Sequence, residues 1–304
     1  AQMDTSFIKG IIVPILTPVD QDENVDEARL RRQVDFVIDH GVHGILAFGS
    51  NGEFYMFQPE EMERALRIIL DQTAHRVPVF FGMGMVNTKS CIILAKMAEQ
   101  AGADGISVLQ PMFLKPTEDE LYAHFKAIAN AVPDLPMLLY NNPGRVGYTM
   151  SGNLVERLAR EVDNIVGIKD SSGDMTQTEE FIRRTQDIDF KVFGGKDTLI
   201  YATLAHGGVG AVCTTANYMP DLVVSVYNAY LKGNPRQALE YQFKLNPIRL
   251  SMDKTSFPVA TKDMANMLHM DVGIPIRPSL PTAEDSPAYV LMQNELEKAG
   301  LLEH

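Results

Sequence analysis

The sequence predicts an α/β fold, a closed (β/α)8 TIM barrel followed by a C-terminal helical extension. Eight short apolar segments recur between residues 10 and 215. Segments with the apolar spacing of amphipathic helices separate them. Alternation of eight strands with helices over this length is typical of a (β/α)8 barrel. A doubly wound open sheet has the same periodicity and stays open as the alternative architecture.

The expected strands are almost continuously apolar. This is typical of parallel strands that are buried on both faces, whereas a strand with one solvated face alternates apolar and polar residues. We expect strands at residues 10–19, 43–49, 77–84, 104–110, 136–142, 165–172, 190–195 and 208–215.

The segments between the strands have helical signals. Leu30, Val34 and Val37 recur at three- and four-residue intervals, and Pro59 stands near the start of the second helix. Proline is favoured in a first turn because its missing N–H would have no partner within the helix. Glycines within residues 101–105 indicate a helix end before the next strand.

The C-terminal part of the chain has no strand signal after residue 216. Four segments there have helical patterns, at residues 222–233, 235–252, 257–270 and 288–300. We interpret the first as the last barrel helix. The barrel with its active site then covers residues 1–225, and residues 226–304 form an extension packed on it as part of one structural unit.

Composition excludes several classes of partner. The formal net charge is -12, and lysines and arginines do not cluster as phosphate-backbone binding requires. No apolar run is long enough to span a bilayer, and residues 1–10 lack a signal-peptide pattern. Cys91 and Cys213 suggest reduced thiols. The histidines lack metal-ligand spacing, so we expect no metal. We expect a cytoplasmic protein that binds neither nucleic acid nor membrane.

Lys169 is the first candidate for a catalytic role. It lies within the sixth expected strand, in the segment "GIKDSS", and strand ends carry the active site of a barrel. Burial disfavours the charged ammonium, which frees the amine to attack a carbonyl group. The alternatives are a structural ion pair with Asp170 or a side chain that extends to solvent.

Tyr140 ends the fifth expected strand. A phenol at this place can move protons to and from a lysine-bound intermediate. The alternative is a core tyrosine with one hydrogen-bond partner.

Two turns offer groups that can bind an anion. In "GSNGE", residues 49–53, small residues can direct backbone N–H groups at a carboxylate, or the segment is only a tight turn. Glu53 is either an acid/base group or a carboxylate that holds this loop. Arg145, in "NPGRVG", can bind a second carboxylate through two N–H donors or lie in solvent.

Together these segments resemble the dihydrodipicolinate synthase / N-acetylneuraminate lyase superfamily. The matching segments are "GSNGE", "YNNPGRVG" and "GIKDSSGD", in this order and spacing, and the likeness runs from about residue 8 to residue 300. The resemblance implies a pyruvate-dependent class I aldolase or lyase on a (β/α)8 barrel with a C-terminal helical extension. It also implies a homotetramer and no metal or organic cofactor.

The resemblance implies a role for each matching residue. Lys169 would form a Schiff base with the keto carbon of pyruvate or another 2-keto acid, and the protonated imine would accept electrons during carbon–carbon cleavage. Tyr140 would relay protons, with Ser50 beside it in the catalytic group. The amides and side chains of Ser50 and Asn51 would bind the pyruvate carboxylate. The remaining pocket lining would come from Gly194 and the backbone around Val212.

The chain departs from the synthase branch at two places. That branch has two threonines where Ser50 and Asn51 stand, and two tyrosines where Met112 and Phe113 stand. Phe113 has no hydroxyl to relay a proton from a neighbouring subunit. Arg145 matches the arginine that binds the second substrate's carboxylate in synthases. The sialic-acid lyase branch lacks that arginine and ranks lower.

These features favour a lyase that releases pyruvate from a 2-keto-4-hydroxy acid, such as a 2-keto-3-deoxy sugar acid or 4-hydroxy-2-oxoglutarate. Condensation of pyruvate with aspartate semialdehyde by a dihydrodipicolinate synthase is the alternative. A Schiff-base dehydratase or deaminase and a non-catalytic keto-acid binder stay open as well.

Overall fold

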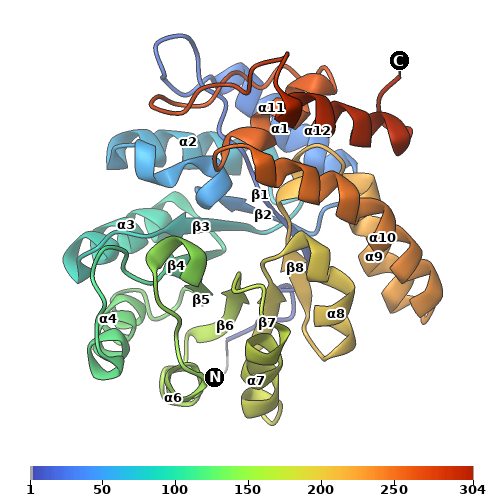
Figure 1. The fold of residues 1–304 in the computed structure, drawn as a ribbon. Coiled ribbons are helices and arrows are strands. Elements are labelled where there is room, and N and C mark those ends of the chain that lie inside the picture. Colours follow the sequence, from blue (N-terminus) through green and yellow to red (C-terminus); the bar gives the residue numbers. More distant parts are fainter. Residues whose placement is uncertain (1–2, 304) are drawn as a thin grey trace.

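The computed structural model describes residues 3–303, and its centre is a closed barrel of eight parallel strands in the order of the chain (Figure 1). The predicted (β/α)8 fold is confirmed. The strands are β1 (Gly10–Pro14), β2 (Gly44–Ala47), β3 (Val79–Met83), β4 (Gly105–Leu109), β5 (Met137–Asn141), β6 (Ile165–Asp170), β7 (Lys191–Gly194) and β8 (Gly210–Val212).

The barrel closes where β1 pairs with β8. Gly10 lies opposite Gly210 in this pair. A Cβ atom on Gly210 would overlap the backbone of Gly10, and Gly10 itself has a positive φ of 81°. Only glycine allows both the close approach and this backbone conformation without strain.

Each strand is followed in the chain by at least one helix, and helices surround the barrel (Figure 1). The helices are α1 (Glu27–Asp39), α2 (Pro59–Thr73), α3 (Thr88–Ala101), α4 (Glu118–Ala131), the short α5 (Pro143–Val146), α6 (Gly152–Glu161), α7 (Met175–Thr185), α8 (Ile200–Ala205) and α9 (Pro220–Leu231). Pro59 begins α2, and Gly102 ends α3 in the left-handed conformation, so both predicted helix boundaries are confirmed.

The expected strands were longer than the observed ones. β1 ends at Pro14 although residues up to 19 stay almost fully buried. The backbone N–H of Leu16 donates to the side chain of Asn217 at 2.9 Å rather than to a neighbouring strand. Burial therefore continues past the end of the β-ladder, and an apolar run alone does not reveal where a strand ends.

Apolar side chains fill the barrel in two layers. Inside the ring of strands, Ile12, Leu46, Phe80 and Phe193 belong to a closed apolar cluster. A larger apolar cluster lies between the strands and the surrounding helices. The barrel is therefore solid, and its polar side chains gather at the carboxyl ends of the strands.

The extension comprises α10 (Pro235–Ser251), α11 (Val259–Met267) and α12 (Pro287–Lys298), coloured orange to red in Figure 1. α10 packs along α9 and α8, and α11 packs on the short 3-10 helix at residues 214–217 that follows β8. The extension therefore reaches the strand ends. The domain division after residue 225 stays a prediction, and this residue lies within α9.

Candidate active site

Three of the predicted site residues meet at the carboxyl end of the barrel. Tyr140 on β5 and Lys169 on β6 are directly paired in the sheet, and the Lys169 amine lies 4.2 Å from the centre of the Tyr140 ring. Ser50, in the turn after β2, shares a 3.2 Å hydrogen bond with the Tyr140 hydroxyl. Amine, phenol and hydroxyl thus form one contiguous group.

A bulge in β6 directs Lys169 into the barrel. The pairing with β5 shifts after Ile165, so that Val166 is an extra residue in β6. Ile165 packs on the helix side, and strict alternation would place Lys169, four residues later, on that same side. With the bulge, Val166 packs inward and Ile168 outward, and Lys169 faces the interior beside Tyr140. Bulges commonly redirect a side chain next to an active site.

Lys169 is 5 % exposed and forms no ion pair within the part of the chain that the structure describes. The Asp170 carboxylate instead accepts hydrogen bonds from Asn141 at 3.0 Å, Ser172 at 2.8 Å and Thr178 at 2.6 Å. The alternative of a structural Lys169–Asp170 pair is therefore wrong. A buried amine without a counterion is unusual in a purely structural role.

The hydroxyl of the buried Tyr140 lies in a polar network. Besides Ser50, Asn142 donates to this oxygen through its side-chain amide at 2.8 Å. Burial raises the pKa of Tyr140, but the charge of Lys169 and hydrogen bonds from Ser50, Asn142 and Ser171 outweigh it and lower the pKa below its ordinary value. This environment favours transfer of a proton from the phenol, as the predicted relay requires.

The turn after β2 presents two backbone donors. Ser50 and Asn51 begin a short 3-10 helix, residues 50–52. Neither of their backbone N–H groups donates to any described residue. Amides at the start of a helical turn are suited to binding an anion. The Asn51 side chain donates to Thr214 at 2.9 Å and accepts from Thr261 at 2.6 Å, so it fixes the turn and leaves the amides for a ligand.

Glu53 ties the turn after β2 to α11 through a buried ion pair with Lys262. The two charged atoms are 2.8 Å apart, and the side chains are 2 % and 3 % exposed. The other Glu53 oxygen accepts the backbone N–H of Ile276 at 3.0 Å. The sequence left open whether Glu53 is an acid/base group, and these contacts assign it to holding the loop.

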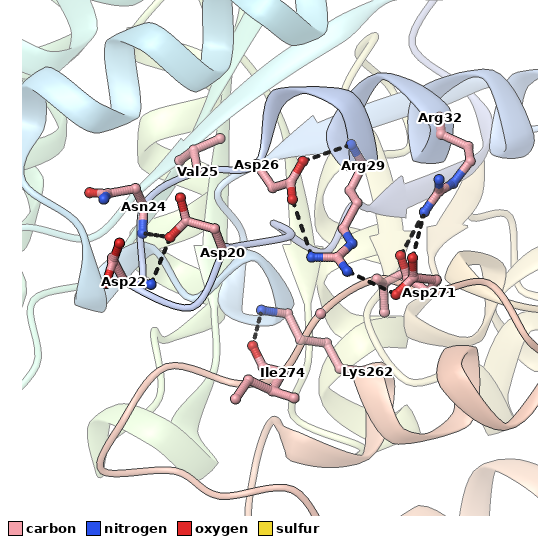
Figure 2. A network of polar contacts seen from close by, with 12 residues as sticks. Asp20, Asp22, Asn24, Val25, Asp26, Arg29, Arg32, Lys262, Asp271 and Ile274 are labelled. Carbon is pink, nitrogen blue, oxygen red and sulfur yellow. Dashed lines mark hydrogen bonds and ion pairs between the residues drawn. The ribbon is translucent and has the colours of Figure 1, made fainter.

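Lys262 also donates to the backbone carbonyl of Ile274 at 3.0 Å, and Figure 2 shows this contact. In the same view Arg29 of α1 binds both Asp26 and Asp271. Asp271 and Ile274 both lie in the segment between α11 and α12. Arg29 therefore anchors to α1 the same segment that contacts Lys262.

Arg145 lies over the Phe257 ring, with its guanidinium carbon 3.7 Å from the ring centre. Both residues line a cavity of about 150 Å³ whose wall includes Asn51 and Thr214. Asn51, which directly follows Ser50, therefore belongs both to the turn after β2 and to the wall of this cavity.

Gly194 and Val212 stand at the ends of neighbouring strands. A Cβ on Gly194 would point at Thr203 of α8, 2.6 Å from its hydroxyl. The Val212 side chain belongs to the apolar cluster inside the barrel. The role of each in lining the substrate pocket stays a prediction.

Comparison of the chain with known proteins identifies its family. A family model described as the dihydrodipicolinate synthetase family matches residues 7–295. The chain belongs to this family. Members of it are class I aldolases and lyases, and this chain is therefore an enzyme of that type.

Curated relatives in the family are named 4-hydroxy-tetrahydrodipicolinate synthase. The protein of Methanopyrus kandleri is 35 % identical over 296 residues, which cover 97 % of this chain and 97 % of the relative. That of Methanoculleus marisnigri is 36 % identical over 273 residues, covering 89 % of this chain and 92 % of the relative.

Solved structures of the family have the same fold. A prophage protein of the dihydrodipicolinic acid synthase family from E. coli K12, in complex with pyruvate, has a TM-score of 0.92 at 31 % identity, covering 97 % of this chain and 99 % of that chain. The chloride-inhibited dihydrodipicolinate synthase from Acinetobacter baumannii, complexed with pyruvate, has a TM-score of 0.91 at 33 % identity, covering 97 % and 100 %.

Several residues of the site were not identified from the sequence. Asn142 lies within the quoted segment "YNNPGRVG", and its position two residues after Tyr140 could have indicated its contact with that phenol. No local sequence pattern marks Thr214, Thr261 and Lys262, because they reach the β2 turn from distant parts of the chain. Within residues 3–303, no helix is long and apolar enough to cross a membrane.

Proposed function

We propose that this enzyme is a Schiff-base lyase that cleaves a 2-keto-4-hydroxy acid into pyruvate and an aldehyde. The observation that supports this function most strongly is the buried, unpaired Lys169 amine beside Tyr140. An amine without a counterion can attack a ketone, and a phenol in contact with it can move the protons that each step requires.

In the proposed reaction, the Lys169 amine adds to the C2 carbonyl of the substrate, and loss of water gives a protonated imine. Tyr140, whose pKa is lowered, gives its proton to the oxygen that leaves as water and then takes the proton of the C4 hydroxyl. The C3–C4 bond then breaks, its electron pair moves toward the imine, and the C4 oxygen becomes the aldehyde carbonyl. Tyr140 returns the proton to C3, and hydrolysis of the imine releases pyruvate and regenerates the amine.

Ser50 and Asn51 are proposed to hold the carboxylate of the pyruvate half through their backbone N–H groups, which have no described partner. The Ser50 hydroxyl also supports the Tyr140 oxygen at 3.2 Å. The same turn therefore positions the substrate and the proton relay.

Phe113 supports cleavage over synthesis. It stands where the synthase branch has a tyrosine, its side chain is 97 % exposed, and it has no hydroxyl for a proton relay. The second candidate is a 4-hydroxy-tetrahydrodipicolinate synthase, which the names of the relatives favour. Arg145 fits the cleavage of 4-hydroxy-2-oxoglutarate and the condensation with aspartate semialdehyde alike, because both bring a second carboxylate to the site.

The direction of pyruvate change separates these candidates. Purified enzyme is incubated with 4-hydroxy-2-keto acids, including 4-hydroxy-2-oxoglutarate and 2-keto-3-deoxygluconate, and separately with pyruvate and aspartate semialdehyde. Release of pyruvate from the first set is expected. Consumption of pyruvate only with the semialdehyde would assign a synthase. A Schiff base without any pyruvate change would indicate a dehydratase or deaminase.

We propose a homotetramer as the assembly. Phe113 and Leu114 are 97 % and 50 % exposed, and Phe113 has a left-handed φ of 72°. Large apolar side chains exposed side by side are typical of a surface that a partner covers. Sedimentation velocity is expected to show a tetramer that Phe113→Asp weakens, and a monomeric wild-type protein would refute the assembly.

A further inference from the structure

A cavity whose wall includes Asn51, the residue after Ser50, has a positive lining in an otherwise acidic protein. Of its charged lining residues, Arg145, Lys196 and Arg249 are cationic and Asp253 is anionic. Arg249 and Asp253 pair with each other at 2.8 Å. Within residues 3–303, Arg145 and Lys196 form no ion pair. Two uncompensated positive charges therefore line this cavity, whereas the whole chain carries a formal net charge of -12.

The two cations flank the strand that carries Lys169. Arg145 follows β5, and Lys196 follows β7 by two residues. The backbone N–H of Gly195 donates to the carbonyl of Asp170 at 2.7 Å, so the start of the Lys196 turn is fixed to the end of β6. The Lys196 stem passes Gly173, in the loop after β6. Both positive side chains thus approach the cavity from loops next to the reacting amine.

Arg145 is oriented by Phe257, whose ring covers one face of the guanidinium at 3.7 Å. Stacking of this kind leaves the N–H donors at the edge of the plane free. A planar edge of donors fits a carboxylate in two-pronged fashion, and a nearby ammonium adds a point charge.

We propose that Lys196, together with Arg145, forms a subsite for a carboxylate at the distal end of the substrate, and that Lys196 is a specificity residue. This inference rests on the proposed function. The cavity of about 150 Å³ corresponds to about five water volumes, which suits a two-carbon aldehyde acid. The favoured substrates are therefore short 2-keto-4-hydroxy diacids.

The test compares 4-hydroxy-2-oxoglutarate with 4-hydroxy-2-oxopentanoate, in which a methyl group replaces the distal carboxylate. Lys196→Met keeps the length of the side chain and removes its charge. Loss of one charge-assisted contact is worth about 1.5–3 kcal/mol, or about a ten-fold to hundred-fold change. We expect KM for the diacid to rise by at least about ten-fold more than KM for the methyl analogue, and the diacid preference to weaken with added salt.

The matched control is Lys232→Met, at the exposed end of α9, which is expected to change neither KM. Equal changes for the two substrates in Lys196→Met, or no change, would overturn the subsite. A wild-type preference for 2-keto-3-deoxy-6-phosphogluconate over the diacid would overturn the choice of a carboxylate over a phosphate.

Borohydride trapping of pyruvate separates this failure from failure of the proposed function. If wild type and Lys196→Met both trap pyruvate on Lys169 but have the same substrate preference, only the subsite is wrong. If the wild-type enzyme traps no pyruvate, both the proposed function and the subsite that rests on it are wrong.

Discussion

Lys262→Met is expected to destabilise the protein strongly, because it leaves the Glu53 carboxylate buried without its counterion. The two side chains are 2 % and 3 % exposed, and the charges are 2.8 Å apart. After the substitution, the backbone N–H of Ile276 at 3.0 Å is the remaining described donor to Glu53. Removal of one partner of a buried pair costs about 3–5 kcal/mol, a large part of a total stability of about 5–15 kcal/mol.

Thermal unfolding followed by circular dichroism measures this effect. A loss of about 3–5 kcal/mol, at about 2 °C per kcal/mol for a chain of this size, lowers Tm by at least about 6 °C. The double variant Glu53→Gln/Lys262→Met is expected to recover most of the loss, since it removes both charges and keeps an acceptor for Ile276. Arg277→Met, which breaks an exposed pair with Glu23, is the control and is expected to change Tm little.

The alkaline pH dependence gives a second signature of the same pair. Burial lowers the pKa of Lys262, although Glu53 opposes the shift. Between the lowered value and the ordinary value of 10.5, the unfolded chain binds more protons than the folded one. The contribution of Lys262 to stability therefore rises with pH in that window, and Lys262→Met lacks this rise. If the single variant were as stable as wild type, or the double variant less stable than the single, the reasoning would be refuted.

Three further variants test other parts of the site and of its support. Tyr140→Phe is expected to lower kcat by about 10²–10⁴ while borohydride still traps pyruvate; an undiminished kcat would exclude the relay. Gly167→Ala places a Cβ against the Lys191 carbonyl and 2.8 Å from Leu138, and is expected to cost about 1–3 kcal/mol and to reduce trapping; unchanged urea unfolding would contradict this. Burial raises the pKa of Asp263, although hydrogen bonds from Thr282 oppose the shift. The contribution of Asp263 to stability therefore falls as pH rises from 3.8 to the raised value. Asp263→Asn is expected to remove this fall, as measured by urea unfolding at several pH values.

The sequence was sufficient for the architecture because parallel strands buried on both faces are almost continuously apolar. It also predicted that Tyr140 and Lys169 meet, since the ends of strands five and six are neighbours in a barrel. Strand lengths were less predictable: Leu16 stays buried after β1 ends.

Other features of the site depend on contacts between distant residues, which no local pattern reveals. The bulge at Val166 decides that Lys169 faces inward, and this shift is visible only in the pairing of two strands. The residues that fix the β2 turn, Thr261 and Lys262, belong to a helix about 210 residues later in the chain. Propensity and periodicity describe neighbours along the sequence, so they carry no information about such ties.

The measurement that tests the central claim most directly is reduction with borohydride in the presence of pyruvate, followed by peptide mass spectrometry. We expect the mass of a reduced pyruvate adduct on the peptide that contains Lys169, and no adduct in the Lys169→Ala variant. An unmodified Lys169 peptide in wild-type enzyme would show that this lysine is not the carbonyl-binding nucleophile, and the proposed mechanism would be wrong.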